Sequence, residues 1–132
     1  MRSRARDVFG KRAGFYATSA VHTEPEILGR LAELARAQPT DIVLDVGTGT
    51  GHTAFALSSG AGLVVATDIT PEMLLEARLL QAEQGIANVA LGLAEAGQLP
   101  FSGQGFDVVT CRRAGHHFVD IGAALRDMAR VL

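Results

Sequence analysis

The sequence has one cysteine, Cys111, among its 132 residues, and it has no tryptophan. A single cysteine excludes an intramolecular disulfide and a cysteine-based zinc site. It also indicates a reducing compartment, so we predict a cytoplasmic location. No run of about 18 apolar residues is present, and the sequence therefore predicts no membrane span. The start of the chain also lacks the apolar segment of a secretory signal.

The 12 Lys and Arg residues against 14 Asp and Glu residues give a net charge of −2, which does not favour nucleic acid as a partner. Residues 1–12 differ from the rest, because they carry five basic residues and one acidic residue. This arm is typical of a solvated, frayed terminus, and a transit peptide or a polyanion-binding arm is the alternative. The length predicts one domain, residues 23–132, after an N-terminal segment of residues 1–22.

Four short and almost continuously apolar segments are predicted strands. They are residues 41–46, 63–68, 89–93 and 106–111. Such segments are typical of strands that are covered on both faces, as in a parallel sheet. Helical patterns occupy residues 23–38, 51–59, 70–85 and 121–132. This alternation predicts an α/β fold with a doubly wound parallel sheet.

Apolar residues at helical spacing predict the buried faces of the first and last helices. The first helix is expected to begin at the capping box Thr23-x-x-Glu26 and to end before Pro39. Its stripe consists of Ile27, Leu28, Leu31, Leu34 and Ala35. The stripe of the last helix consists of Ile121, Ala124, Leu125, Met128, Ala129 and Leu132. The longest loop, residues 92–105, is predicted to contact a ligand.

A glycine-rich segment joins the first strand to the short helix that follows it. It is Asp45-Val46-Gly47-Thr48-Gly49-Thr50-Gly51. Alternate glycines allow a positive φ and leave the backbone open to a ligand, and the helix start presents unpaired N–H groups. Because ligands of doubly wound sheets bind at the carboxyl ends of the strands, we predict a nucleotide-binding loop here. The alternative is an ordinary glycine-rich turn.

Two ligand classes fit this loop. The dinucleotide pattern G-x-G-x-x-A is met by Gly49, Gly51 and Ala54, so NAD stays open. However, the carboxylate of Asp45 would repel a diphosphate and attract the ammonium and sulfonium groups of S-adenosylmethionine (SAM). Asp68, which ends the second strand, is suited to bind a ribose diol in either ligand. The residues therefore favour SAM without excluding NAD.

Further motifs follow one another in a fixed order from about residue 15 to the end. They are FYATSAVH at 15–22, LDVGTGTG at 44–51, Thr67-Asp68, Ala94-Glu95, Leu99-Pro100-Phe101, FDVV at 106–109, His116-His117-Phe118 and Arg130-Val131-Leu132. In these motifs the chain resembles the class I SAM-dependent methyltransferases of the ubiquinone/menaquinone-biosynthesis type (methyltransferase type 11-like). The resemblance implies a Rossmann-like domain that binds SAM. It also implies methyl transfer to a small-molecule or lipid/quinone-like acceptor by in-line displacement.

The resemblance also assigns residues to the cofactor site. Residues of the glycine loop would hold the methionine end of SAM, namely Asp45, Gly47, Thr48, Gly49 and Gly51. Asp68 would bind the ribose, Ile69 would pack on the adenine, and Ala94 and Glu95 would border its edge. Cys111 and Arg112 would face the methionine portion, and Tyr16, Ser19 and His22 would lie on a lid segment within residues 1–22.

The sequence departs from the family in three places. Many members have an acid where this chain has Leu93, and the loop from Glu95 to Leu99 is slightly longer. Members also continue beyond Arg-Val-Leu into a turn and three more strands, so we expect a fragment with only the first four strands. The segment 106–111 would then form an apolar sheet edge that is open to self-association.

His116 and His117 are the predicted catalytic residues, because they follow the fourth strand on the ligand side. One of them would act as a general base if the acceptor must lose a proton, and the alternative is a packing or capping pair. No metal site is predicted, since adjacent histidines without a suitably spaced carboxylate do not form one. The alternative functions are an NAD(P)-binding oxidoreductase and a catalytically silent SAM-binding module.

Overall fold

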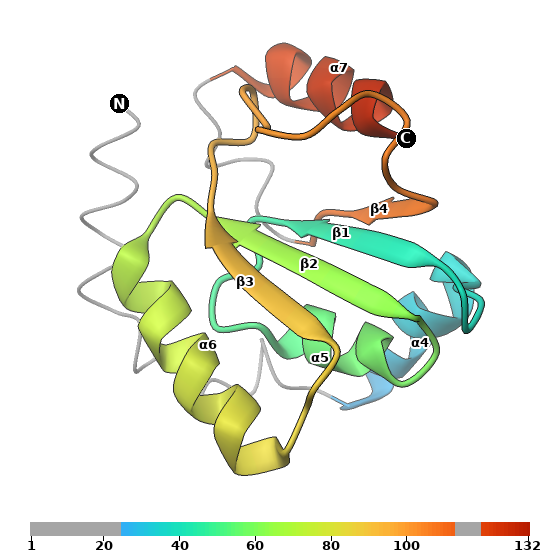
Figure 1. Ribbon diagram of the computed structural model, residues 1–132, viewed down its shortest axis with the longest axis vertical. Coiled ribbons are helices and arrows are strands. Elements are labelled where there is room, and N and C mark those ends of the chain that lie inside the picture. The colour runs from blue at the N-terminus through green and yellow to red at the C-terminus, as the bar shows by residue number, and fades with distance from the viewer. Residues whose placement is uncertain (1–24, 113–119) are drawn as a thin grey trace.

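The computed structural model describes residues 25–112 and 120–132. Helices and strands alternate along these residues (Figure 1). They are α4 (Pro25–Ala35), β1 (Ile42–Val46), α5 (His52–Ser58), β2 (Leu63–Asp68), α6 (Pro71–Gln84), β3 (Val89–Leu93), β4 (Val108–Thr110) and α7 (Ile121–Val131). The predicted alternation of strands and helices is confirmed. The whole basic arm and lid segment, residues 1–22, lies outside the described residues, as does Thr23 of the expected capping box.

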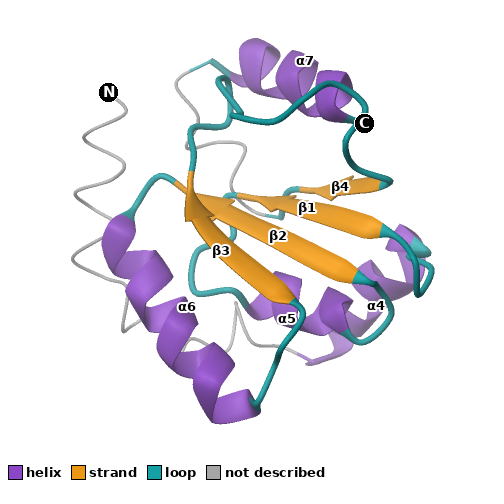
Figure 2. Cartoon of the chain, viewed as in Figure 1, coloured by secondary structure: helices purple, strands orange, loops and turns teal. Residues whose placement is uncertain are grey.

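The four strands form one parallel sheet in the order β3-β2-β1-β4. Helices α4, α5 and α6 lie on one face of the sheet and α7 lies on the other (Figure 2). The predicted doubly wound α/β fold is therefore confirmed. From β1 the chain proceeds to β2 and β3 on one side and returns to β4 on the other. The strand order thus reverses between β1 and β4, and a ligand crevice is expected at the carboxyl ends of these two strands.

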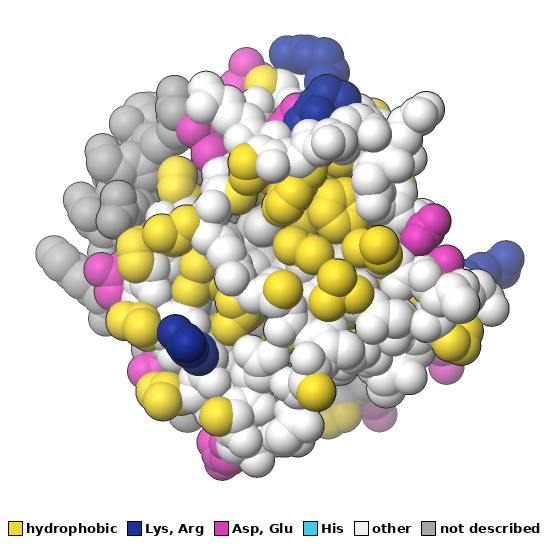
Figure 3. Space-filling model, in the orientation of Figure 1, with side chains coloured by type: hydrophobic (Ala, Val, Ile, Leu, Met, Phe, Trp, Pro, Cys, Tyr) yellow, Lys and Arg dark blue, Asp and Glu magenta, His cyan; other side chains and the backbone are white. Residues whose placement is uncertain are grey.

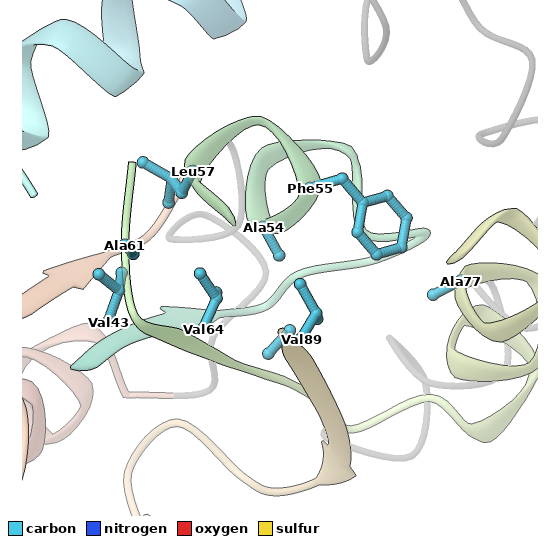
Figure 4. Close-up of a cluster of buried hydrophobic side chains, with 9 residues drawn as sticks. Val43, Ala54, Phe55, Leu57, Ala61, Val64, Ala77 and Val89 are labelled. Atoms are coloured by element: carbon cyan, nitrogen blue, oxygen red, sulfur yellow. The ribbon is translucent and has the colours of Figure 1, made fainter. Parts of the chain in front are cut away.

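Two clusters of buried side chains hold the layers together. The first lies between the sheet and helices α5 and α6 (Figure 4) and consists of Val43, Ala54, Phe55, Leu57, Ala61, Val64, Ala66, Ala77 and Val89. The second lies between the sheet and α7 and consists of Leu44, Val46, Ala96, Leu99, Phe106, Ala124, Met128 and Val131. Successive residues of a strand point to opposite faces, so Val43 and Leu44 belong to different clusters.

Helix α6 has the boundaries that its sequence predicts. Pro71 occupies the first turn, and Gly85 ends the helix with a left-handed φ of 65° that glycine adopts without strain. Thr70 precedes the helix, but its hydroxyl makes no capping hydrogen bond to the helix. Its N–H group instead donates to Asp68 Oδ1 over 2.9 Å, which ties the start of α6 to the end of β2.

Two expectations for α4 were wrong. The helix ends at Ala35 rather than before Pro39, because Arg36 takes a left-handed φ of 51° that interrupts the helical backbone. Leu34 was expected on the buried stripe, yet it is 76% exposed. Ala32 and Ala35 pack against the first cluster, so small side chains of α4 make this contact.

The apolar face predicted for α7 was only partly right. Ala124 and Met128 are buried as expected, but Leu125 is 58% exposed. Ile121, Ala129 and Leu132 are exposed as well. Val131, which was not expected on this face, is fully buried. The buried line therefore follows positions 124, 128 and 131, a spacing of one helical turn each. Figure 3 shows apolar atoms gathered at the surface between α7 and the sheet.

Strand β4 is shorter than predicted, because it spans Val108–Thr110 instead of 106–111. The N–H group of Phe106 donates to the carbonyl of Val131 in α7 over 2.9 Å, so this residue is taken out of the sheet ladder. Within the described residues, β4 pairs with β1 alone and lies at the edge of the sheet. The predicted edge position of this strand is confirmed.

Candidate functional site

The glycine loop leaves β1 with a backbone that only glycine adopts easily. Gly47, Gly49 and Gly51 have φ values of 68°, 59° and 92°. A Cβ atom on Gly51 would lie 2.7 Å from Phe55 Cζ, so the loop is packed against α5 at this point. At Gly49 nothing lies within 4 Å of the position of a Cβ atom, which leaves the backbone accessible there. The loop is thus closed toward the core and open where a ligand would approach.

Three hydrogen bonds join this loop and the start of α6 to the end of β2. The N–H group of Thr48 donates to the carbonyl of Thr67 over 2.8 Å. Asp68 Oδ2 accepts the N–H group of Gly49 over 2.8 Å, and Oδ1 accepts that of Thr70 over 2.9 Å. The hydroxyl of Thr70 and the N–H group of Ile69 also interact with this carboxylate and lower its pKa. The structure therefore brings Asp68 to the glycine loop, as the spacing of the two motifs predicts.

Asp45 lies beneath the loop and is only 1% exposed. Its Oδ2 atom accepts the hydroxyl of Thr48 and its Oδ1 atom accepts the hydroxyl of Thr110, each over 2.7 Å. The carboxylate thus bridges the glycine loop and β4. Direct contact between Asp45 and a cofactor stays a prediction. Thr110 was missed by the sequence analysis, although a hydroxyl residue at the end of an apolar strand was a possible signal.

The two carboxyl groups have perturbed proton affinities. Burial raises the pKa of Asp45 to about 6, and this effect outweighs the hydroxyl groups of Thr110 and Thr48, which lower it. The charge of Asp68 also raises that pKa, and the charge of Arg112 lowers it. Burial likewise raises the pKa of Asp68. Two neighbouring carboxyl groups with raised pKa values favour a ligand that brings positive charge.

The remaining predicted site residues are placed as follows. The N–H group of Ala94 donates to the carbonyl of Asp68 over 3.1 Å, so the start of the long loop meets the end of β2. The carbonyl of Glu95 accepts the N–H group of Gln98 over 3.0 Å in a tight turn. Ile69 is half-buried at the same edge of the sheet.

On the other side of the loop, Cys111 packs against the second cluster, and the charge of Arg112 acts on Asp45. Tyr16, Ser19, His22, His116 and His117 lie outside the described residues, and their roles stay predictions. In the part of the chain that is described, no three His, Cys, Asp or Glu side chains are grouped so that they could hold a metal ion.

The long loop after β3 is held by two side chains of α7 that sequence reasoning missed. Asp127 accepts the N–H group of Leu99 through Oδ2 and the Nε–H group of Arg130 through Oδ1. The guanidinium of Arg130 also donates to the carbonyls of Phe101 and Leu99 over 2.7 and 2.9 Å. The hydrogen bond from Arg130 is the main cause that lowers the pKa of Asp127. This pair fixes the loop beyond Glu95.

A parallel sheet of this order, with a glycine loop after β1 and an acid at the end of β2, defines a Rossmann-like domain. Residues 43–132 match the family described as a methyltransferase domain. The chain therefore belongs to this methyltransferase family, and its sheet is that of the class I SAM-dependent enzymes. Among residues 25–112 and 120–132, no helix is long and apolar enough to cross a membrane.

Several known methyltransferases are similar to this chain. The uncharacterized methyltransferase YcgJ of Bacillus subtilis is 40% identical over 94% of this chain and 49% of its own length. Its crystal structure superposes with a TM-score of 0.78 over 80% of this chain and 45% of that chain, at 41% identity. The ubiquinone/menaquinone biosynthesis C-methyltransferase UbiE of Shewanella frigidimarina is 38% identical over 76% of this chain and 41% of its own length. Nocamycin O-methyltransferase of Saccharothrix syringae is 31% identical over 95% of this chain and 46% of its own length. The chain spans about half the length of these curated relatives.

Proposed function

We propose that this chain binds SAM, and that the whole protein transfers the methyl group of SAM to a small-molecule or lipid/quinone-like acceptor. The observation that carries the proposal is the hydrogen bond from the N–H group of Gly49 to the carboxylate of Asp68, over 2.8 Å. The backbone at Gly49 is also accessible to a ligand. In this position a carboxylate is suited to accept hydrogen bonds from both ribose hydroxyls. Membership of the methyltransferase family supports SAM over NAD as the nucleoside that is bound.

The residues around the loop match the chemistry of SAM. Its ammonium and sulfonium groups are cationic, and the buried carboxyl of Asp45 together with Asp68 supplies negative charge at the loop. In our proposal Gly47, Thr48, Gly49 and Gly51 bind the methionine end through backbone groups. Ile69, Ala94 and Glu95 contact the adenine, Cys111 and Arg112 face the methionine portion, and Tyr16 and His22 close over the site.

In this proposal the protein contributes to the reaction mainly by positioning the methyl donor and the acceptor. When bound, SAM supplies a methyl group that is activated by its sulfonium and is transferred by in-line displacement. The glycine loop and Asp68 would fix the orientation of the donor, and alignment of two reactants in this way accounts for much of the acceleration of such reactions. We propose that His116 or His117 accepts a proton where the acceptor must lose one.

The names of the relatives indicate more than one kind of acceptor atom. One relative is named an O-methyltransferase and another a C-methyltransferase, so both oxygen and carbon acceptors occur among similar proteins. Within the described residues β4 pairs with β1 alone, so its other edge offers backbone groups to a second strand, and we include pairing with a second copy of the chain in the proposal. A cytoplasmic location is part of the same proposal.

Calorimetric titration with SAM, S-adenosylhomocysteine and NAD tests the function. We expect heat of binding from the first two ligands and none from NAD. The substitution Asp68→Asn should weaken binding about tenfold or more, because it weakens charge-assisted hydrogen bonds to the ribose. Asp120→Asn is the matched control, since asparagine also caps a helix and Asp120 is exposed at the start of α7.

The pH dependence gives a second criterion. A cationic ligand favours the ionised forms of Asp45 and Asp68, so the affinity for SAM should rise from about pH 5 to about pH 7. A diphosphate would show the opposite slope. Heat from NAD alone would overturn the proposal, and binding of SAM without turnover of any acceptor by the whole protein would support the silent module instead.

A further inference from the structure

We propose that Thr110 is a positioning residue for the cofactor-binding loop and that it acts through the carboxyl group of Asp45. The proposal rests on the function proposed above, because it assigns the loop to the cofactor. Thr110 itself lies at the end of β4, on the opposite side of β1 from Asp68. It belongs to none of the motifs that define the glycine loop.

The geometry is a line of two hydrogen bonds that crosses the point where the strand order reverses. Thr110 is the register partner of Asp45 on the neighbouring strand. The Thr110 hydroxyl donates to Asp45 Oδ1, and the Thr48 hydroxyl donates to Oδ2, each over 2.7 Å. Thr48 stands between Gly47 and Gly49, which have no side chains of their own. The line therefore joins the end of β4 to the centre of the loop.

Because Asp45 is buried, its two hydrogen bonds strongly restrict the position of the glycine loop. Asp45 is 1% exposed, so water cannot replace a lost partner without opening the structure. When a buried carboxyl loses one of its donors, an acceptor oxygen is left without a hydrogen bond, which raises the free energy. Rotation of the carboxyl or the approach of another donor lowers this free energy again. A rotation of the carboxyl group or the arrival of another donor would also move the Thr48 hydroxyl, because that hydroxyl donates to the same carboxyl group. The position of the loop thus depends on the hydroxyl at residue 110.

The neighbouring strand supplies a matched control. Thr67 is the second last residue of β2 and is 2% exposed. Among the described residues its hydroxyl has no hydrogen-bond partner, whereas its backbone carbonyl accepts the N–H group of Thr48. Replacement of either threonine by valine removes a buried hydroxyl and keeps the shape of the side chain. Only Thr110→Val removes a hydrogen bond to Asp45.

The experiment compares Thr110→Val, Thr110→Ser and Thr67→Val in the full chain. The measurements are the Kd for S-adenosylhomocysteine by calorimetry and the hydrogen-exchange rates of the amides at residues 47–51. We expect Thr110→Val to weaken binding about tenfold and to speed exchange in the loop, beyond any change in global stability. Thr110→Ser, which keeps the donor, should bind within about threefold of the wild-type chain. Thr67→Val, which removes a buried hydroxyl but no side-chain hydrogen bond, should weaken binding clearly less than Thr110→Val does.

Each outcome decides one of the two proposals. Binding by Thr110→Val that equals that of Thr67→Val, or a serine variant as weak as the valine variant, overturns the role of Thr110. If the wild-type chain does not bind S-adenosylhomocysteine, the proposed function fails. Unchanged exchange at residues 47–51 in Thr110→Val overturns the present inference separately. Should the valine variant fail to fold, Thr110→Ala removes the same donor with less crowding and is judged by the same criteria.

Discussion

The buried carboxyl of Asp45 should make the stability of the chain depend on pH in a predictable direction. Burial raises the pKa of Asp45 from 3.8 to about 6 in the folded chain. The folded state therefore binds this proton more tightly than the unfolded state does. Its stabilising effect is present in full below about pH 4, and it is lost as the pH rises through about 6. The neutral substitution Asp45→Asn should abolish this dependence.

The magnitude follows from the size of the pKa change. A rise from 3.8 to about 6 corresponds to about 3 kcal/mol of preference for the protonated form. Between about pH 4 and about pH 7, the free energy of unfolding of the wild-type chain should fall by about 2 kcal/mol relative to that of Asp45→Asn. The comparison across pH removes any constant effect of the substitution on the hydrogen bonds with Thr48 and Thr110.

Urea denaturation at several pH values, followed by circular dichroism, measures this difference. Asp120→Asn serves as the control at an exposed helix cap, and its difference from the wild-type chain should not follow the same curve. The charge of Asp68 contributes to the raised pKa of Asp45, so an added Asp68→Asn substitution should reduce the pH dependence. If the wild-type chain and Asp45→Asn have parallel stability curves from about pH 4 to about pH 7, the reasoning about burial is refuted.

Two further substitutions test the loops. Gly51→Ala places a Cβ atom 2.7 Å from Phe55 Cζ at a φ of 92°, and we expect a loss of about 3 kcal/mol in urea denaturation. Gly29→Ala, in α4 with no atom within 4 Å, should be neutral or stabilising, and equal losses at the two positions would contradict this account. Arg130→Lys keeps the charge but loses the forked contacts to Phe101 and Leu99, so the chain should lose about 1–2 kcal/mol and the loop amides should exchange faster. The same change at exposed Arg126 should have little effect. If loop exchange in Arg130→Lys equals that of the wild-type chain, Arg130 does not hold the loop.

The order of strands and helices could be predicted from the sequence because each signal is local. Continuous apolar runs indicated buried strands, and Pro71 and Gly85 marked the ends of α6. The alternation of these elements in turn implied a doubly wound sheet. The glycine loop and Asp68 were found in the same way, since their residue types and spacing carry the chemistry.

Faces of helices were less predictable. Leu34 and Leu125 have helical spacing with buried neighbours, yet both are exposed. A stripe of apolar residues is wider than the line of contact, and the partner surface selects which residues are covered. For α7 the selection is made by the loop, because Asp127 and Arg130 bond to it and Val131 accepts the N–H group of Phe106.

The sequence by itself determined the class of fold, the loop and the acids at the ends of β1 and β2. Only the tertiary structure decided what these acids contact. Asp45 and Thr110 are 65 positions apart and meet because β4 returns to the side of β1 that β2 leaves free. No local pattern encodes that meeting, since a hydrogen bond between distant residues depends on strand pairing and register. Burial then raises the pKa of Asp45, which is a property of the packed protein and not of the residue type.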